Sequence, residues 1–164
     1  MRVLGIDPGT AITGYGLVDS HAGREALVSY GTITTPSDME MALRLYRINK
    51  ELSHIIDYFK PESVAVEQIF YHRNAKTAIS VAQARGVVLC TVAASGLTVA
   101  EYTPLEVKQA VVGYGNAEKK QVQIMVKNIL NLDHIPKPDD AADALAVAIC
   151  HVHSARCKYF FRGE

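Results

Sequence analysis

Three strand-like runs occupy the first 35 residues, and the connections between them are too short for anything but tight turns. Residues 2–7 and 12–19 flank Pro8-Gly9-Thr10, and the third run, at 26–35, follows a turn that contains Gly23. Apolar runs bounded by Gly, Pro and Ser are typical of β-strands. Because such short connections can only reverse the chain, the pattern predicts an antiparallel three-stranded meander.

Helical and strand-like segments alternate in the rest of the chain. Residues 37–60 carry apolar side chains at helical spacing and end before Pro61, and Ser37 with Glu40 has the spacing of a capping box. The remaining expected elements are strands at 63–68 and 97–102 and helices at 75–95, 104–112, 117–131 and 139–157. Crossovers of this kind add parallel strands to the meander, so we predict an α/β fold with a five-stranded mixed sheet and helices on both faces.

The size and composition are those of an ordinary globular protein. The 164 residues suit one domain, expected at 1–157 with a short tail at 158–164. The formal net charge is zero and neither favours nor excludes a nucleic-acid partner. Cys90, Cys150 and Cys157 lack the paired spacing of a zinc site and are expected to be free thiols. The sequence shows no signal peptide and no apolar run long enough for a membrane span, so we expect a cytoplasmic protein.

Two carboxylates end strands that are otherwise apolar. Asp7 closes the first strand, and Glu67 lies at the end of the strand expected at 63–68. Side chains alternate along a strand, so each acid belongs to a defined face of the sheet. If these strands are parallel neighbours, their carboxyl ends meet at the edge where α/β proteins place their chemistry.

A third group of acids opens the last expected helix, in the sequence PKPDDAADALAVAIC. Asp140 and Asp143 are three residues apart and share one helical face, but Asp139 is also helically adjacent to Asp143. Each acid has a local explanation, because Asp7 could form a turn before Pro-Gly, and Asp139 and Asp140 could cap the helix. Three such coincidences would be needed to produce one acidic cluster beneath an uncharged sheet.

The clustered acids favour a metal site. Carboxylates that are forced together raise one another's pKa values unless a cation neutralises them. Hard divalent cations take oxygen ligands, and Mg²⁺ keeps positions open for water and phosphate oxygens. Four carboxylates around two metal ions about 4 Å apart can support in-line attack of water on a phosphodiester. The expected ligands are Asp7, Glu67, Asp140 and Asp143.

Basic residues are concentrated in the middle of the chain. No acid occurs between Glu67 and Glu101, while Arg73, Lys76 and Arg85 lie inside this interval. Four lysines follow as a second cluster: Lys108, Lys119, Lys120 and Lys127. Charged runs are often only solvated faces. Beside a negative active site they would instead hold a polyanion that the carboxylates repel.

Two helices carry further expectations. Asn116 is the expected N-cap of the helix at 117–131, which would put Lys119 in the first turn, where backbone N–H groups favour phosphate. Residues 75–95 are small or apolar nearly all the way round. A helix of that kind is either central to the core or shared with a partner subunit, and the second possibility predicts self-association.

Four motifs of this chain resemble, in order, those of RuvC-type Holliday junction resolvases in the ribonuclease H-like superfamily: LGIDPGTAITGYG, AVEQIFYHRNAKTAISVAQARG, VKQAVVGYGNAEKKQV and DDAADALAVAICH. The resemblance extends from residue 3 to about residue 153. It implies a magnesium-dependent homodimer with two ions per active site, in which Mn²⁺ is a possible substitute. Such enzymes nick two opposed strands of a four-way DNA junction symmetrically in homologous recombination and repair, leaving 5′-phosphate and 3′-hydroxyl ends. A branch-migration motor of the RuvA–RuvB type is the further partner implied.

The resemblance also assigns roles to individual residues. The catalytic, metal-binding acids fall on Asp7, Glu67, Asp140 and Asp143, and the pattern Asp-Ala-Ala-Asp selects Asp140 over Asp139. Lys119 is linked to cleavage as well as to DNA binding. The implied DNA-binding residues are Phe70, Arg73, Asn74, Lys76, Lys108, Lys119 and Lys120. Tyr71 and His72 depart from some members of the family, which leaves the base preference near the cut open.

Two other readings of the same motifs have to be weighed. An actin-like ATPase or sugar kinase also carries Asp-x-Gly-Thr in its first hairpin, but such proteins need two lobes and more than twice this chain length. A non-catalytic ribonuclease H-like nucleic-acid binder would share the Asp and Glu strands but not the QARG and VKQAVVG segments. Nucleotide binding would favour the first reading, and equal affinity for junction and duplex the second.

Overall fold

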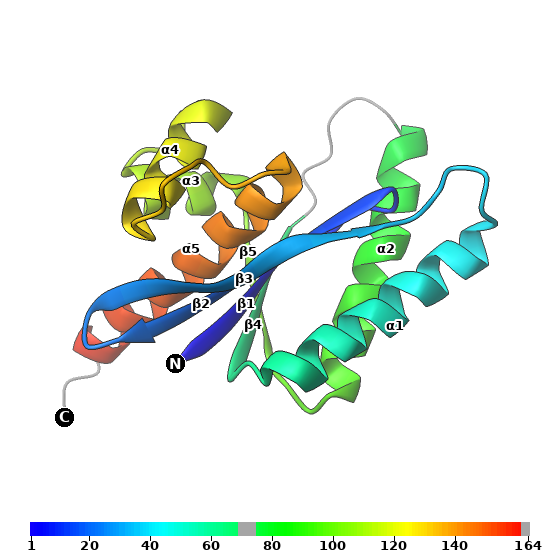
Figure 1. Cartoon of the computed structure of the whole chain (residues 1–164), viewed down its shortest axis with the longest axis horizontal. Helices are drawn as coiled ribbons and strands as arrows, with labels where there is room; N and C mark the ends of the chain where they lie inside the picture. The colour runs from blue at the N-terminus through cyan, green and yellow to red at the C-terminus, as the bar shows by residue number, and fades with distance from the viewer. Residues whose placement is uncertain (69–74, 162–164) are drawn as a thin grey trace.

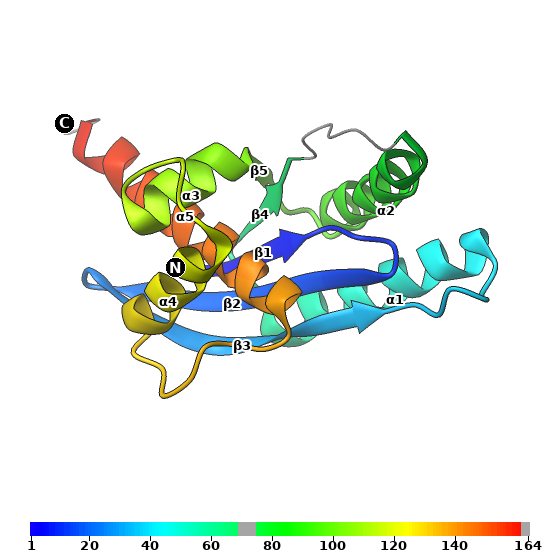
Figure 2. The ribbon, with the colours of Figure 1, turned by 90° about the horizontal axis from the view of Figure 1, so that it is seen from above.

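A computed structural model describes residues 1–68 and 75–161, and it confirms the predicted five-stranded mixed sheet. The strands are β1 (Arg2–Asp7), β2 (Ile12–His21), β3 (Arg24–Thr34), β4 (Ser63–Glu67) and β5 (Val99–Tyr102). Their order across the sheet is β3-β2-β1-β4-β5. The first three strands form the antiparallel meander, while β4 runs parallel to both β1 and β5. The carboxyl ends of β1 and β4 therefore lie on the same side of the molecule (Figure 2).

Helices cover both faces of the sheet, as the alternation of segments predicts (Figure 1). They are α1 (Met41–Phe59), α2 (Ala75–Ala94), α3 (Pro104–Val112), α4 (Lys119–Ile129) and α5 (Asp139–Phe161). One apolar core joins α1 and α2 to one face of the sheet, and a second joins α3, α4 and α5 to the other. Within the described residues, no helix has the length and apolar character that crossing a membrane requires.

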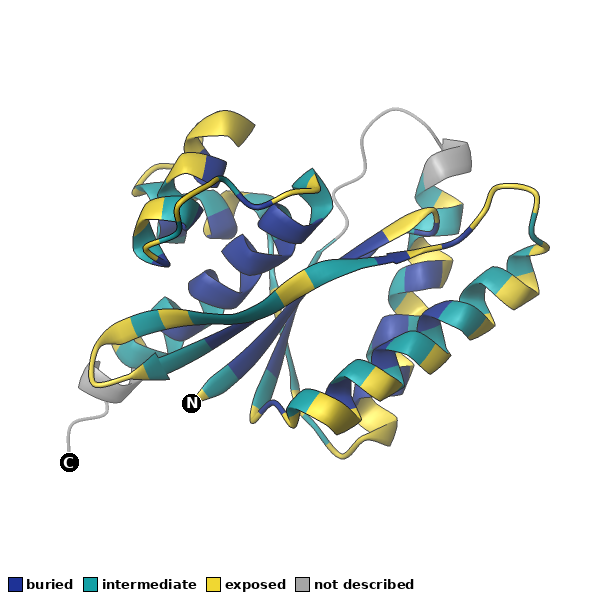
Figure 3. Cartoon of the chain, viewed as in Figure 1, coloured by how far each residue is buried: buried dark blue, intermediate teal, exposed yellow. Residues whose placement is uncertain are grey.

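The backbone of α5 lies directly against the meander, and the middle of this helix is the most continuously buried helical segment in Figure 3. Glycines in β1 and β2 make this approach possible. A Cβ on Gly5 would come within 2.1 Å of the carbonyl oxygen of Ala144, and a Cβ on Gly14 within 2.0 Å of that of Asp140. Because no Cβ fits in either place, small residues at these positions fix both the height and the register of α5 on the sheet.

Three helix ends differ from the sequence-based expectation. The predicted capping box of Ser37 and Glu40 is wrong: α1 begins after Glu40, which forms no side-chain cap. The expected Asn116 cap is also wrong, because α4 begins after Glu118, whose N–H donates to the Gln121 side chain at 2.8 Å. Lys119 nevertheless lies in the first turn of α4, as expected. The last helix continues past residue 157 to Phe161 and so includes part of the segment expected as a tail.

Candidate active site

Asp7 and Glu67 lie side by side at the ends of two parallel strands. Ile6 pairs with Val66 across β1 and β4, so the next residue on each strand is one of the two acids. Two positions earlier on each strand, Gly5 lies against the backbone of α5 and Ala65 packs in the same core as that helix. Strand alternation therefore directs both carboxylates toward the same helix.

The first turns of α5 bring two more acids to this edge of the sheet. Asp140 is placed by the contact between its backbone and Gly14, which pairs with Asp7 across β1 and β2. Asp143 follows one helical turn later on the same side. Asp139 lies at the exposed rim of this cluster, because one oxygen of its carboxylate pairs with Lys137 at 2.7 Å, the other lies 3.8 Å from Nζ of Lys119, and its side chain is 45% exposed.

Burial and mutual repulsion raise the pKa values of the central acids. The pKa of Asp7 is raised to about 8, first by burial and then by the charges of Glu67, Asp143 and Asp140. The pKa of Glu67 is raised to about 7 by burial and by Asp143, although a hydrogen bond with Asp7 opposes the rise. Burial also raises the pKa of Asp143. A cluster of this kind gains most from a cation that replaces its protons.

Lys119 supplies one positive charge to the cluster. Its Nζ lies 2.8 Å from Oδ2 of Asp143 and 3.8 Å from Oδ2 of Asp139, and its side chain is 55% exposed. A hollow of about 260 Å³ beside this contact is lined by Glu67, Pro104, Val107, Lys108, Lys119, Val122, Asp143 and Ala146. Acids and lysines therefore share this hollow, as a site for a metal-bound phosphate would require.

A second hollow, of about 310 Å³, is bordered by the turn that follows Asp7 and by residues of α1 and α2. Its lining consists of Gly9, Thr10, Ala11, Ile12, Arg44, Ser80, Val81 and Asp140. The acids thus lie between two hollows, one with Glu67 and Asp143 on its wall and the other with Asp140. Sequence analysis missed Arg44, since nothing in its spacing distinguishes it from the other charges of α1.

The donor set suits hard divalent cations. Buried carboxylate oxygens are ligands that Mg²⁺ and Mn²⁺ accept, and a single exposed ammonium group cannot neutralise all of them. Within the part of the chain that the structure describes, no three acidic, histidine or cysteine side chains stand ready to hold one ion without moving. The hydrogen bond between Asp7 and Glu67 and the Lys119–Asp143 ion pair are the contacts that a cation would replace.

The remaining predicted residues divide into three groups. Phe70, Arg73 and Asn74, with their neighbours Tyr71 and His72, lie outside the described residues. Lys76 belongs to the first turn of α2, with its side chain outside the described part. Lys108 lines the hollow beside Glu67, and Lys120 is exposed next to Lys119.

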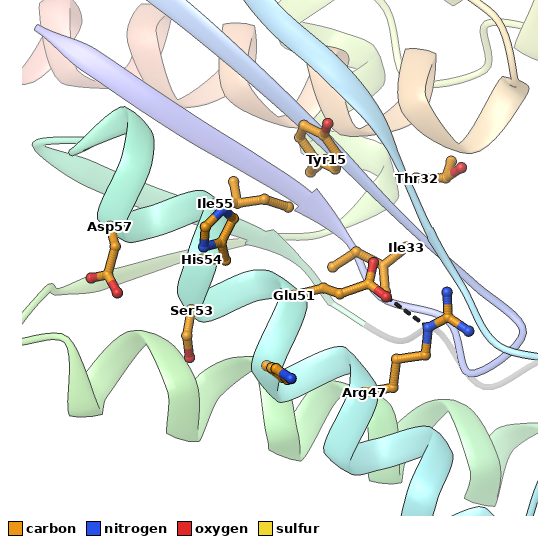
Figure 4. A pocket seen from close by; sticks show the side chains of 10 residues that line it. Tyr15, Thr32, Ile33, Arg47, Glu51, Ser53, His54, Ile55 and Asp57 are labelled. Carbon is orange, nitrogen blue, oxygen red and sulfur yellow. Dashed lines mark hydrogen bonds and ion pairs between the residues drawn. The ribbon is translucent and has the colours of Figure 1, made fainter.

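A larger hollow, of about 710 Å³, lies between α1 and the meander, on the face opposite to the acids (Figure 4). Figure 4 shows Arg47 and Glu51 pointing toward each other along its wall, and the two side chains form an ion pair of 2.6 Å. Tyr15, Thr32 and Ile33 form the sheet side. Its charges are mixed and partly paired, so this hollow has less capacity for a metal or a polyanion than the edge that carries the acids.

The comparisons with known proteins point in one direction. The family model described as "Crossover junction endodeoxyribonuclease RuvC" matches residues 3–151. A crossover junction endodeoxyribonuclease RuvC from Syntrophomonas wolfei is 66% identical over 164 residues, covering 100% of this chain and 95% of the relative. That from Caldanaerobacter subterraneus is 57% identical, covering 94% of this chain and 93% of the relative. The solved structure of Thermus thermophilus RuvC in complex with a Holliday junction substrate has a TM-score of 0.91 at 38% identity and covers 96% of both chains.

Proposed function

This chain belongs to the RuvC family of crossover junction endodeoxyribonucleases, and we propose that its own acids and lysines cut four-way DNA junctions at the edge of the sheet described above. Its fold is ribonuclease H-like. The observation that carries the proposal is the meeting of Asp7, Glu67, Asp140 and Asp143 at one edge of the sheet, beside Lys119.

The acids are proposed as the metal ligands, with two Mg²⁺ ions per site and Mn²⁺ as a substitute. Bound divalent cations would supply Lewis acidity, making water a better nucleophile and stabilising charge on the leaving oxygen. Asp7 and Glu67 must lose protons to act as ligands, which their raised pKa values oppose and a cation favours. The products would carry 5′-phosphate and 3′-hydroxyl ends.

Lys119 is proposed to bind the scissile phosphate. Its ammonium group contacts Asp143 at 2.8 Å on the wall of the hollow beside Glu67, and its exposed stem leaves it free to turn toward a substrate. With Asp143 serving as a metal ligand, this lysine would be released to donate to a non-bridging phosphate oxygen. Lys108, on the same wall, would hold a neighbouring phosphate. Phe70, Arg73, Asn74, Lys76 and Lys120 are proposed as further DNA contacts.

We also propose that the active form is a homodimer. The described part of the chain forms one such acidic site, whereas paired symmetric nicks require two sites facing opposed strands. The exposed face of α2 offers a surface for this contact, because it carries Ile79 at 64% exposure together with small residues such as Ala82 and Gly86. Ile79→Glu is expected to shift the mass measured by light scattering from dimer toward monomer. A branch-migration motor of the RuvA–RuvB type is the proposed further partner.

The function is tested with a synthetic four-way junction and a linear duplex of the same sequence. In Mg²⁺, the wild-type chain is expected to nick two opposed strands of the junction and to leave the duplex uncut. Asp7→Asn is expected to abolish cutting but to retain junction binding, because it removes a negative charge and leaves the lysines in place. Equal cutting of junction and duplex would contradict structure selectivity, and undiminished cutting by Asp7→Asn would contradict the catalytic assignment.

A further inference from the structure

Arg44 is a half-buried arginine without a carboxylate partner among the described residues. Four other arginines in this part of the chain form ion pairs: Arg2 with Asp19, Arg47 with Glu51, Arg85 with Glu101, and Arg156 with Glu25. Arg24 also lacks a described partner, but it is exposed at the start of β3. A guanidinium group that is partly removed from water and left unpaired is a ready site for an anion.

Hydrogen bonds hold the Arg44 side chain in a fixed place. Its Nε donates to Oγ1 of Thr35 at 2.8 Å, and its Nη2 lies 3.4 Å from the carbonyl oxygen of Thr35. The Thr35 hydroxyl in turn donates to the carbonyl oxygen of Thr10 at 2.5 Å, and the Thr10 hydroxyl donates to that of Ser80 at 2.5 Å. Arg44 is thereby connected to the turn that follows Asp7 and to α2. The fork is pre-organised, so little conformational entropy remains to be lost when it binds a ligand.

The position of Arg44 determines which anion would reach it. It lines the hollow that has Asp140 on its wall, whereas Lys108 and Lys119 line the hollow on the other side of the acids. A DNA strand whose scissile phosphate lies at the acids must continue in both directions, and the acids repel its neighbouring phosphates. The lysines meet that need on one side. Among the described residues that line the other hollow, Arg44 alone is basic.

We propose that Arg44 binds a phosphate of the cleaved DNA strand in the hollow beside the turn after Asp7, on the opposite side of the acids from Lys108 and Lys119. This inference rests on the proposed function and extends it from the cut itself to the path of the strand. The ligand class is a backbone phosphodiester, bound without regard to base sequence. Planar Arg forks match the two non-bridging oxygens of a phosphate.

The salt dependence of junction binding tests this proposal. Binding is measured in EDTA, which prevents cutting, over a series of KCl concentrations for wild type, Arg44→Gln and Arg24→Gln. Arg44→Gln is expected to weaken binding roughly tenfold and to reduce the slope of log K against log salt by about 0.9, the value for one phosphate contact. Arg24→Gln removes the same charge from an unpaired arginine outside both hollows and is expected to leave the slope unchanged. An Arg44→Gln slope equal to that of wild type would overturn the proposal.

Single methylphosphonate linkages separate a phosphate contact from a role in packing. The neutral linkages are placed one at a time at positions on either side of the cut. At one position the linkage is expected to weaken binding by wild type and to cause no further loss with Arg44→Gln. Additive losses at every position would contradict the contact. If a thermal scan shows that Arg44→Gln is not folded, Arg44→Lys is used in its place. This variant keeps the charge, so we expect the wild-type salt slope and a reduced affinity for the junction. If wild type cuts the junction but Arg44→Gln and every neutral linkage weaken binding additively, this inference alone is refuted. If wild type does not cut the junction, the proposed function is refuted.

Discussion

Gly14 and Asp140 meet backbone against backbone, since a Cβ on Gly14 would lie only 2.0 Å from the Asp140 carbonyl oxygen. Gly14 also pairs with Asp7 across β1 and β2. One residue without a side chain therefore aligns two of the proposed metal ligands, one from the end of a strand and one from the start of a helix. The alignment depends on close packing over the whole length of α5, which also contacts the sheet at Gly5.

Gly14→Ala tests this alignment. The added methyl group meets backbone atoms, which cannot rotate away, so we expect a loss of about 1–3 kcal/mol in the free energy of unfolding and a displaced Asp140. The junction-cutting rate is expected to fall well beyond what the unfolded fraction explains. Gly31→Ala is the matched control in β3, because its Cβ would meet only the Tyr15 ring, with the hydroxyl at 2.7 Å. If both variants cut at the wild-type rate, the proposed alignment is unnecessary for cleavage.

The sequence made much of the fold predictable because its patterns are local. Short connections define the meander, and apolar spacing separates the helices from the strands. Asp7 and Glu67 each lie at the carboxyl end of a strand, and this position predicted the edge of the sheet that carries them. The pairing of Ile6 with Val66 confirms that the two strands are parallel neighbours. Helix starts were less predictable. Ser37 and Asn116 are of residue types that favour the N-cap, but Glu40 and Glu118 occupy the N-cap positions of α1 and α4.

The parts of the site that sequence reasoning missed depend on contacts between distant segments. Arg44 becomes distinctive only because Thr35 fixes it beside a turn more than thirty residues earlier in the chain. The ambiguity between Asp139 and Asp140 could not be resolved by spacing, because both are helically adjacent to Asp143. Their surroundings differ in the fold, where Lys137 holds Asp139 at the surface and Gly14 places Asp140 beside Asp7.

Asp139→Asn and Asp140→Asn form a matched pair that tests the proposed ligand set. Asp140→Asn is expected to reduce the rate of junction cutting by at least about 10²-fold, because it removes a proposed metal ligand. Asp139→Asn is expected to cut at close to the wild-type rate, since its exposed carboxylate pairs with Lys137. Single-turnover cleavage at saturating enzyme separates the rate from binding. The reverse ranking would assign the ligand role to Asp139.

Lys119→Gln is expected to slow cleavage by about 10²-fold, the usual effect of removing one donor to a developing negative charge. The same change removes the contact that lowers the pKa of Asp143, so the pKa of that acid should rise further. Lys120→Gln has the same change in charge at the exposed neighbouring position and is expected to retain most of the rate. Comparing cleavage at several Mg²⁺ concentrations gives the readout. Equal rates for the two variants would rule out a specific role for Lys119.

The protonation of Asp7 and Glu67 predicts how stability depends on pH and metal. Their pKa values of about 8 and about 7 lie above the ordinary carboxyl values of about 4, so the folded chain binds more protons than the unfolded chain between these limits. Stability from this source is complete below about pH 4 and is lost as the pH rises toward 8. The acids with lowered pKa values, such as Asp19 and Glu106, contribute in the opposite sense, but only up to their ordinary carboxyl pKa values.

In EDTA, the thermal unfolding midpoint is therefore expected to fall between pH 5 and pH 8. Asp7→Asn should flatten this dependence, because the amide does not ionise and the charge that raises the pKa of its neighbours disappears. Mg²⁺ should restore the midpoint most strongly at pH 8, where it no longer competes with protons for the carboxylates. Asp57→Asn, a change on α1 at the opposite face, is the control and should keep the wild-type slope. A midpoint that rises from pH 5 to pH 8 in EDTA would show that the acids are not held protonated by the fold.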